Sequence, residues 1–592
     1  MVEPSFDIPR SAGAAGKRLD SWKEIAGYLS RDVTTVQRWE KREGMPVHRH
    51  QHHSRGSVYA LASELDTWLE GRRVILEDEK AEQEPVPSPD SPSPVPPWRS
   101  RSLWVILATL VAVVLAASAW LAHRSHSRSN ALPKIRSLAV LPFRNLSGDP
   151  AQEYLADGVT EALIGRLAGI HDLRVVSHTS VMRFKNPQMS VPEIAKILNV
   201  DAVVEGSVLR EGNRIRVTAQ LIRAATDEHF WSETYDRELR DALSLQSELA
   251  QTIAEKVAVT LNGQDQERLA AARPVAPEVY ESYLKGRFEL NRASDRPDME
   301  KSIGYFNEAL HQDATFAPAW LGLAEAWTTL GTIMIGGSPG ETRPQAIRFA
   351  KQALALDPTL VEAHVLLGNV LEDEWQWSDA EAEYTRALDL NPNDPTARGA
   401  YAGWLLDQGR TEEALRWIES ARALDPVLVS GGDVAWVLFL MRRYDESIRE
   451  SRSALAAEPE NVGNLMDLGF ALIAENRAPE AVPIMEKAVA LSHGGPAAIG
   501  VLIRAYAYSG RRSDALRVLE DLKRRRAAGY VPPAAFVNAY LGLGDVDQTF
   551  YWLDQAFKEK SNILQYIKTH PCFDPIRNDP RFTALVRRVG LG

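Results

Sequence analysis

Cysteine is almost missing from this chain of 592 residues, which contains a single one, Cys572. One cysteine cannot form an internal disulfide, and it excludes zinc or iron–sulfur sites that need several cysteine ligands. The sequence also shows no activated nucleophile, no carboxylate pair spaced for acid–base chemistry and no loop typical of a bound cofactor. We therefore predict neither an enzyme nor a cofactor or metal site.

The chain also has no excess of positive charge. Its 68 Lys and Arg residues against 79 Asp and Glu residues give a formal net charge of −11. Such a balance argues against coating nucleic acid with the whole surface, but it leaves room for one small DNA-reading module. The 45% of hydrophobic and 25% of charged residues are typical of a folded protein. At about 150 residues per domain, the length predicts about four modules.

Charge is absent altogether from residues 103–122, LWVILATLVAVVLAASAWLA. At ~1.5 Å per residue, a helix of this length would extend about 30 Å, the thickness of a bilayer core. Trp104 and Trp120 lie near its ends, where aromatic rings favour the membrane interface. The stretch predicts one transmembrane helix, in preference to a buried core helix. Residues 74–101 before it are acidic and proline-rich, and they predict a semi-rigid linker.

A small domain is predicted over residues 19–73, after a disordered start at residues 1–18. Ser21 and Glu24 have the spacing of a capping box, which begins a helix. Asp32 is a good N-cap for a second helix. The inward side chains of that helix would be Val33, Val36 and Trp39. Two short helices joined by a tight turn form a helix-turn-helix.

The outer face of the second predicted helix carries groups that can contact base edges and phosphates. These candidate DNA-binding residues are Thr34, Thr35, Gln37, Arg38 and Lys41. A hairpin or wing is predicted to turn at Arg55 and Gly56, and a third helix follows Ser63. The wing contains His48, His50, His52 and His53. A metal site is not predicted there, because no cysteine and no paired acidic ligands accompany the histidines.

The order of these elements, with the residues SWKEIAGYLSRDVTTVQRWEKREG and RGSVYA, resembles the winged DNA-binding domains of the MerR/excisionase type. The resemblance implies that Thr34, Thr35, Gln37 and Arg38 enter the major groove. It also implies that the wing, with Arg49 and Arg55, grips the flanking DNA backbone. A helical protein-interaction module is the alternative interpretation.

Residues 135–262 alternate between strand-like and helix-like patterns. Strands are predicted at 137–143, 173–177, 202–210, 214–224 and 229–235, and helices at 154–167, 192–198 and 247–261. The phrases LAVLPFRNLSGDPAQEYLADGVTEALIGRLA and DAVVEGSVLREGNRIRVTAQLIRAATDEHFWSETYDREL resemble the TolB amino-terminal-like domain. The resemblance implies an α/β module for binding or assembly rather than catalysis.

Residues 277–590 are helical in pattern and repetitive. Small residues recur every 33 or 34 positions: Ala346, Ala380, Ala414, Ser447, Ala481, Ala515 and Thr549. The repeats share similar endings at Asp357, Asn391, Asp425 and Glu458. A helix-turn-helix unit of 34 residues that ends before proline resembles the tetratricopeptide repeat (TPR). About eight such units would stack into a superhelix, because no unit can bury its apolar face alone.

The TPR resemblance implies a concave groove that binds a protein or peptide. Small residues such as Gly368 and Ala402 would let neighbouring helices cross closely. Four tryptophans could line the groove, but we interpret them as core residues. They are Trp375, Trp377, Trp404 and Trp417.

The predicted fold class is therefore multidomain: a small winged helix-turn-helix, one transmembrane helix, a TolB-like α/β domain and an all-α TPR superhelix. The layout resembles CadC-like membrane-anchored one-component regulators. It implies a single-pass protein of the bacterial inner membrane, with a cytoplasmic DNA-binding head and extracytoplasmic sensor domains. Basic residues flanking the apolar stretch slightly favour the opposite orientation. Expected partners are DNA, the membrane, a TPR ligand and a second copy on DNA. The alternative function is an envelope scaffold whose N-terminal module docks a cytoplasmic protein.

Overall fold

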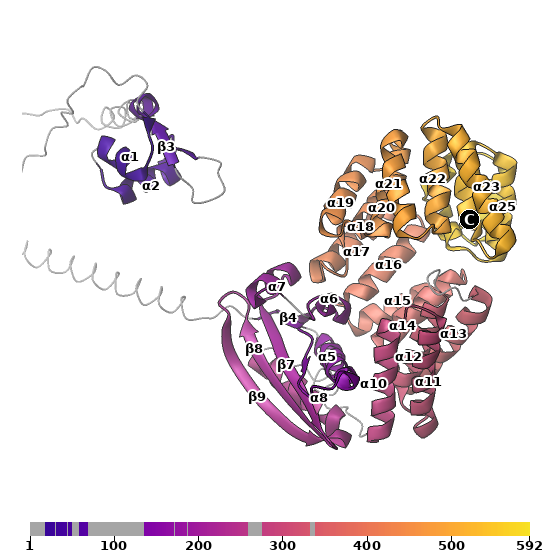
Figure 1. Cartoon of the computed structure of the whole chain (residues 1–592), viewed down its shortest axis with the longest axis horizontal. Helices are drawn as coiled ribbons and strands as arrows, with labels where there is room; N and C mark the ends of the chain where they lie inside the picture. The colour runs from indigo at the N-terminus through magenta and orange to yellow at the C-terminus, as the bar shows by residue number, and fades with distance from the viewer. Residues whose placement is uncertain are drawn as a thin grey trace, which may run out of the picture. The chain divides into compact units, whose positions relative to one another are not determined.

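The computed structural model describes residues 18–29, 31–43, 45–49, 58–68, 135–170, 172–185, 188–257, 275–331 and 338–592. These residues belong to two compact units, which Figure 1 shows. The N-terminal unit lies within residues 1–130, and the large unit lies within residues 131–592.

The predicted transmembrane helix requires a correction to the fold class. Residues 103–122, on which that prediction rests, lie outside the described part of the chain. Within the described part, no helix combines the length and the apolar character that crossing a bilayer requires. The fold is instead mostly helical, with a repeat superhelix and a sheet domain. The single-pass inner-membrane location that followed from the transmembrane helix is accordingly not supported.

The N-terminal unit contains helices and short strands in the order that the sequence predicts. Its elements are β1 Arg18–Leu19, α1 Trp22–Tyr28, α2 Val33–Glu43, β2 His48–Arg49, β3 Val58–Leu61 and a helix over 62–68. The strands form an antiparallel sheet in the order β1-β3-β2. The pairing of β2 with β3 is the expected wing hairpin.

A small apolar core holds the N-terminal unit together. Ile25, Val36 and Leu65 come from three different helices and are completely buried. The rings of Trp39 and Trp68 lie 5.7 Å apart at its edge. The inward orientation predicted for Val33 was wrong, because this side chain is 36% exposed. Val33 is the first residue of α2, and helical side chains lean toward the N-terminal end, beyond the packed turns.

The large unit begins with an α/β block. Its elements are β4 Ser137–Val140, β5 Arg144–Asn145, η1 Pro150–Gln152, α5 Glu153–Ala168, β6 Arg174–Val175, α6 His178–Met182, α7 Val191–Leu198, β7 Ala202–Glu211, β8 Arg214–Arg223, β9 Glu228–Glu238, η2 Leu239–Asp241 and α8 Ala242–Lys256. The sheet order is β6-β4-β7-β8-β9, with β5 on β7. β4 pairs in parallel with β6 and β7, whereas β7, β8 and β9 form an antiparallel meander. Gly212, with φ of +61°, makes the predicted turn between β7 and β8.

Eight consecutive helix pairs follow the α/β block and curve around it (Figure 1). They are α10 Pro277–Arg292, α11 Arg296–Gln312, α12 Ala317–Leu330, α13 Pro339–Leu356, α14 Val361–Asp373, α15 Trp377–Leu390, α16 Pro395–Asp407, α17 Thr411–Leu424, α18 Gly431–Leu440, α19 Tyr444–Ala457, α20 Val462–Ala474, α21 Ala478–Leu491, α22 Pro496–Tyr508, α23 Arg512–Ala528, α24 Pro533–Leu543 and α25 Val546–Lys558. The chain ends in η3 Asn562–Ile567, η4 Pro571–Ile576 and α26 Pro580–Arg588.

The predicted repeat phase matches the buried face of these pairs. The small residues that recur every 33 or 34 positions lie one on the second helix of each pair from α13 to α25, and all are at most 1% exposed. Small residues on the first helices allow close crossing: a Cβ at Gly368 would lie 2.5 Å from the ring of Tyr384 on the next helix. The TPR prediction is therefore confirmed.

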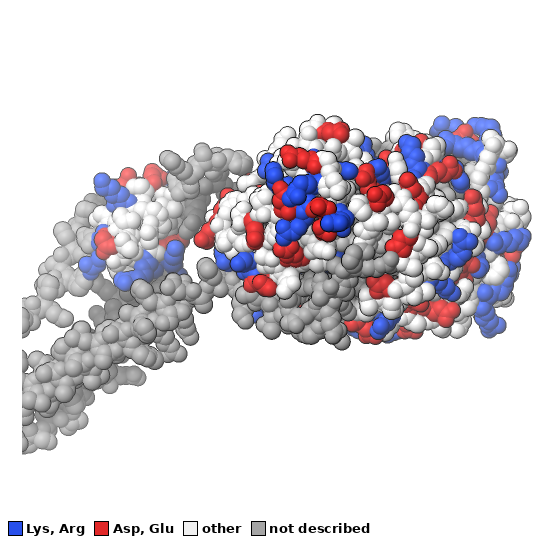
Figure 2. All heavy atoms as spheres, turned by 90° about the horizontal axis from the view of Figure 1, so that it is seen from below, with Lys and Arg blue, Asp and Glu red and all other residues white. Residues whose placement is uncertain are grey.

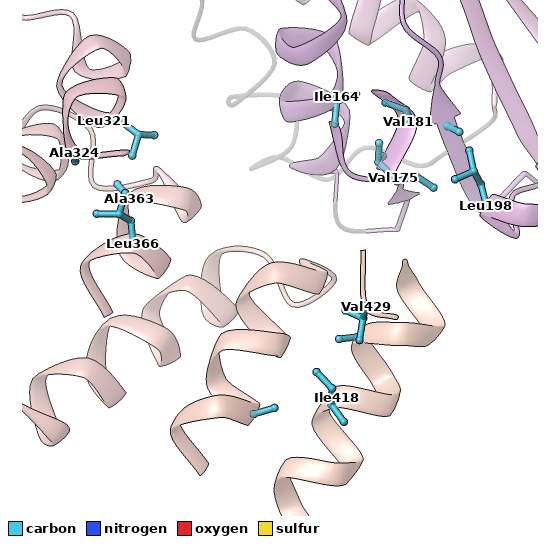
Figure 3. Close-up of a cluster of buried hydrophobic side chains, with 14 of the residues drawn as sticks. Ile164, Val175, Val181, Leu198, Leu321, Ala324, Ala363, Leu366, Ile418 and Val429 are labelled. Atoms are coloured by element: carbon cyan, nitrogen blue, oxygen red, sulfur yellow. The ribbon is translucent and has the colours of Figure 1, made fainter. Parts of the chain in front are cut away.

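One apolar core runs from the α/β block into the repeats. Figure 3 shows Val175 and Val181 of the block together with Leu366 and Val429 of the repeats, all in one cluster of buried side chains. Burial of apolar surface on this scale stabilises the contact between the two parts. The α/β block and the repeats consequently belong to one compact unit.

Candidate nucleic-acid interface and repeat groove

The second helix of the N-terminal unit presents polar side chains along one exposed face. Thr34, Arg38 and Lys41 are exposed and lie four and three residues apart, which places them on the same side of α2. Gln37 is half-buried beside this face. A hydroxyl, a guanidinium and an ammonium in a row can contact both base edges and phosphates.

Thr35 has a different environment from the one predicted for it. Its N–H donates to Asp32 Oδ1 at 2.8 Å, and its hydroxyl donates to Asp32 Oδ2 at 2.7 Å. These hydrogen bonds cap the start of α2 and hold the pKa of Asp32 below its usual range. The Thr35 hydroxyl therefore serves the cap at the start of α2 rather than the outer face of the helix.

Only part of the predicted wing belongs to the described residues. Arg49 is the last residue of β2, with its backbone paired to β3, while Arg55 and three of the four wing histidines lie outside the described residues. His48 is described: its Nε2 lies 2.8 Å from Glu64 Oε2, and its ring stacks on Tyr59. His48 therefore contacts the folded unit itself.

Charge is distributed differently over the large unit. On the face shown in Figure 2, its Lys and Arg side chains are interspersed with Asp and Glu side chains. A mixed surface of this kind does not attract a polyanion over a wide area.

Within the large unit, the ends of successive repeats hold the α/β block. Asp425, completely buried, accepts hydrogen bonds from the N–H of Ser177 at 3.0 Å and the hydroxyl of Ser180 at 2.8 Å. The amide of Asn391 donates to the carbonyl of Ala168 at 3.0 Å. Glu458 forms an ion pair with the block through Arg183. Three of the four repeat endings noted in the sequence are therefore contacts between domains.

A partly buried ion triad also joins the α/β block to the first two helix pairs. Arg287 of α10 contacts Glu161 of α5 and Glu325 of α12. Burial raises the pKa of Glu325 against the opposing effect of the guanidinium. A charge buried in this way is stable only while its partners remain in place.

The inner face of the superhelix is partly covered by the chain's own C-terminal segment, residues 559–591. Gln565 donates to Asp373 of α14 at 2.9 Å, and Trp377 of α15 donates to the carbonyl of Val589 at 2.9 Å. The ring of His570 packs edge-on against Phe470 of α20. The groove predicted to bind a partner thus already contains part of the protein.

The four tryptophans interpreted as core residues pack against other residues of the repeats, and Trp377 also contacts the C-terminal segment. Trp404 is buried and donates to the carbonyl of Trp377 at 3.0 Å. Trp375 packs against Phe557, with ring centroids 5.2 Å apart. Trp417 packs against Tyr401. Their packing role agrees with the sequence interpretation.

A cavity of about 480 Å³ remains open beside the C-terminal segment. Its lining includes Asp433, Trp436 and Asp467 of the repeats, Tyr566 of the C-terminal segment and Arg183 of the α/β block. None of these residues is a predicted site residue. One feature of the sequence could have indicated the cavity: Asp467 is the only acidic residue of the mostly apolar helix α20.

Two family models match the large unit. Residues 134–254 match the second domain of the HilA/YgeH-like transcriptional regulators, and residues 373–427 match the tetratricopeptide repeat. The chain therefore contains a domain of a transcriptional-regulator kind followed by TPR repeats. The predicted TolB-like identity of the α/β block is not supported, because the matching model is that of the regulator domain.

A curated relative, "Putative adenylate cyclase 3" from Rhizobium meliloti (strain 1021), is 34% identical over 260 residues. The match covers 43% of this chain and 43% of that protein, so the chain spans less than half of the relative's length. Neither matched family model describes an enzyme, and the relative's name does not decide whether this chain is one.

Solved structures of TPR proteins are similar to part of the chain. A thermophilic TPR protein of Thermus thermophilus is 16% identical, with a TM-score of 0.28, over 33% of this chain and 99% of that chain. The type IV pilus biogenesis factor PilW is 15% identical, with a TM-score of 0.32, over 36% and 94%. Nothing that those proteins bind or assemble is carried over to this chain.

Proposed function

We propose that this chain is a DNA-binding transcriptional regulator whose N-terminal unit contacts DNA and whose large unit receives the controlling signal. The observation that supports DNA binding is the exposed row of Thr34, Arg38 and Lys41 on α2, next to a wing hairpin. The presence of a regulator-type domain in the same chain supports the transcriptional role.

In this proposal α2 lies in the major groove. Arg38 would contact a base edge, and Lys41 would contact a phosphate. Thr34 and Gln37 would contact the flanks of the same site, whereas Thr35 would act through the Asp32 cap. Contacts from Arg49 and Arg55 to the DNA backbone remain a prediction. Two copies on half-sites about 34 Å apart would fit a palindromic operator.

The test begins with selecting a binding sequence from random duplex DNA with the full chain. Affinity for the selected sequence is then measured at several salt concentrations. We expect Arg38→Ala to weaken binding by about 5- to 150-fold and to relax sequence preference at one base pair. We expect Lys41→Ala to weaken binding to all sequences and to reduce the salt slope by about 1.

Lys23→Ala serves as the matched control, because Lys23 is an exposed lysine on α1 and not on the proposed contact helix. It should leave both affinity and salt slope unchanged. Equal affinities of the wild type and Arg38→Ala, with equal salt slopes, would exclude α2 as the DNA-contacting helix.

A further inference from the structure

The cavity beside the C-terminal segment is built by three parts of the large unit. Its repeat wall consists of the inner faces of α16, α18 and α20. Tyr566 closes it from the C-terminal segment, and Arg183 reaches it from the α/β block. A volume of about 480 Å³ lies within the range of small-ligand sites.

Two polar side chains on α20 line the cavity without a hydrogen-bonding partner among the described residues. Asn464 is 6% exposed, and no side chain or backbone group of the described chain bonds its side-chain amide. Its Oδ1 packs against Gly432, where a Cβ would lie only 1.9 Å away. Asp467, one turn further along the helix, also accepts no hydrogen bond from these residues. Buried polar groups are normally satisfied, so the unpaired side-chain amide of the buried Asn464 is available to a ligand in the cavity.

The charges at this cavity favour a cation. Asp433 and Asp467 contribute two carboxyl groups, and burial and Asp433 together raise the pKa of Asp467 to about 8. The one basic residue of the lining, Arg183, is already paired with Glu458. A neighbouring positive charge would therefore stabilise the ionised form of Asp467.

Aromatic rings complete the environment. Trp436 and Tyr566 both line the cavity, and their centroids lie 5.4 Å apart at nearly perpendicular planes. Ring faces attract cations, most strongly in a partly desolvated site. Gly399 and Gly403 line the wall formed by α16, together with the apolar side chains of Ala402 and Leu406.

We propose that this cavity binds a ligand bearing a positively charged amine or guanidinium group, which pairs with Asp467 and Asp433 and lies beside Trp436. The Asn464 amide would bond a polar atom next to the charge. This inference rests on the proposed function, because it names the chemistry of the signal that the large unit receives. The positive group can belong to a small amine or to a side chain of a peptide.

Isothermal titration calorimetry on the full chain tests the proposal with defined probes. Spermidine represents a free amine, and acetyl-Gly-Arg-Gly-amide represents a peptide side chain. The same peptide with citrulline in place of arginine is a neutral analogue of equal shape. We expect one charged probe to bind and the citrulline peptide to bind about tenfold more weakly or not at all. The preferred probe then identifies the source of the charge.

Three variants locate the site. Asp467→Asn should weaken binding about tenfold or more by removing charge without changing shape. Gly403→Met should abolish binding by filling the cavity, since no atom lies within 4 Å of a Cβ at Gly403. Asp445→Asn, which changes an exposed acid on α19, should have no effect. If Asp467→Asn fails to fold, Gly403→Met still tests whether the ligand binds in this cavity.

The pH dependence gives an independent readout. The carboxyl group of Asp467 must be ionised to pair with a cation, so affinity should fall by up to about tenfold per pH unit below a pH of about 8. The other titratable groups on the lining are Asp433, Glu458, Arg183 and Tyr566. Asp467→Asn should flatten this dependence.

Two results would overturn the proposal: neither charged probe binds at millimolar concentration, or the citrulline peptide binds as tightly as the arginine peptide. Equal binding by wild type and Gly403→Met would place any observed site elsewhere. The DNA-binding measurement on Arg38→Ala is separate, so a failure here leaves the DNA-binding proposal standing, and the reverse also holds.

Discussion

Two junctions between repeats share the sequence Leu-Asp-Pro but face different surroundings. At the first, Asp357 accepts hydrogen bonds from the N–H of Thr359 at 2.9 Å and from its hydroxyl at 2.7 Å, all within one loop. At the second, Asp425 caps its own loop in a similar way and also binds Ser177 and Ser180 of the α/β block. The same repeat residue is a local cap in one place and a domain contact in the other.

The difference shows that the same position in two repeats can have different structural roles. Asp425 is completely buried, because the α/β block covers it, whereas Asp357 remains partly exposed. A buried hydrogen-bonded carboxylate is costly to remove, since its donors are left without partners. The two junctions should therefore respond very differently to identical substitutions.

The largest loss of stability is expected from a substitution of Arg287, which also joins the α/β block to the repeats. Arg287→Met leaves Glu161 and Glu325 close together without their shared partner. We expect the free energy of unfolding to fall by about 3–5 kcal/mol, the usual cost of breaking a buried ion pair. Urea unfolding of the full chain, followed by tryptophan fluorescence, measures this change.

Arg296→Met is the control for Arg287→Met. Arg296 also contacts two carboxylates, Glu300 and Glu341, each at 3.6 Å, but its side chain is 40% exposed. Its removal should cost no more than about 1 kcal/mol. Similar losses in the two variants would mean that the triad does not fasten the α/β block.

The next largest loss of stability is expected at one of the two Leu-Asp-Pro junctions. Asp425→Ala and Asp357→Ala each remove a loop cap, but only Asp425→Ala also leaves the Ser177 N–H and the Ser180 hydroxyl unpaired. We expect Asp425→Ala to cost about 2–3 kcal/mol more than Asp357→Ala. Hydrogen exchange should also become faster over residues 174–182 in Asp425→Ala alone. Equal losses of unfolding free energy in the two variants, with unchanged hydrogen exchange, would show that the two junctions have the same role.

Much of the large unit could be predicted because its signals are local and repeated. The recurring small residues on alternate helices mark the buried face, and the turn at Gly212 follows from three adjacent residues. The contact of Asp425 with Ser177 joins residues 248 positions apart, and nothing near either residue indicates it. Helix α6 was missed because its five residues are too few to show a period.

The end of the chain was assigned to the repeats for a related reason. Residues 559–591 form the 3-10 turns η3 and η4 and the short helix α26, which contact the groove instead of adding another helix pair. In the N-terminal unit, the exposed face of α2 was predicted well from its polar residues. The bonds of Thr35 to Asp32 were not predicted, because an N-cap residue can also leave the hydroxyl of a nearby threonine unbonded.

The smallest effect on stability is expected for the ion pair between Glu458 and Arg183, another contact of a repeat ending with the α/β block. Both side chains are substantially exposed, so a double-mutant cycle with Glu458→Gln and Arg183→Gln should give a coupling below about 1 kcal/mol. Hydrogen bonds from Asn461 and Arg183 lower the pKa of Glu458. Its contribution should therefore be complete above the ordinary glutamate pKa and disappear as the pH falls through the lowered value. A coupling as large as the loss in Asp425→Ala would show that exposed repeat endings fasten the block as strongly as buried ones.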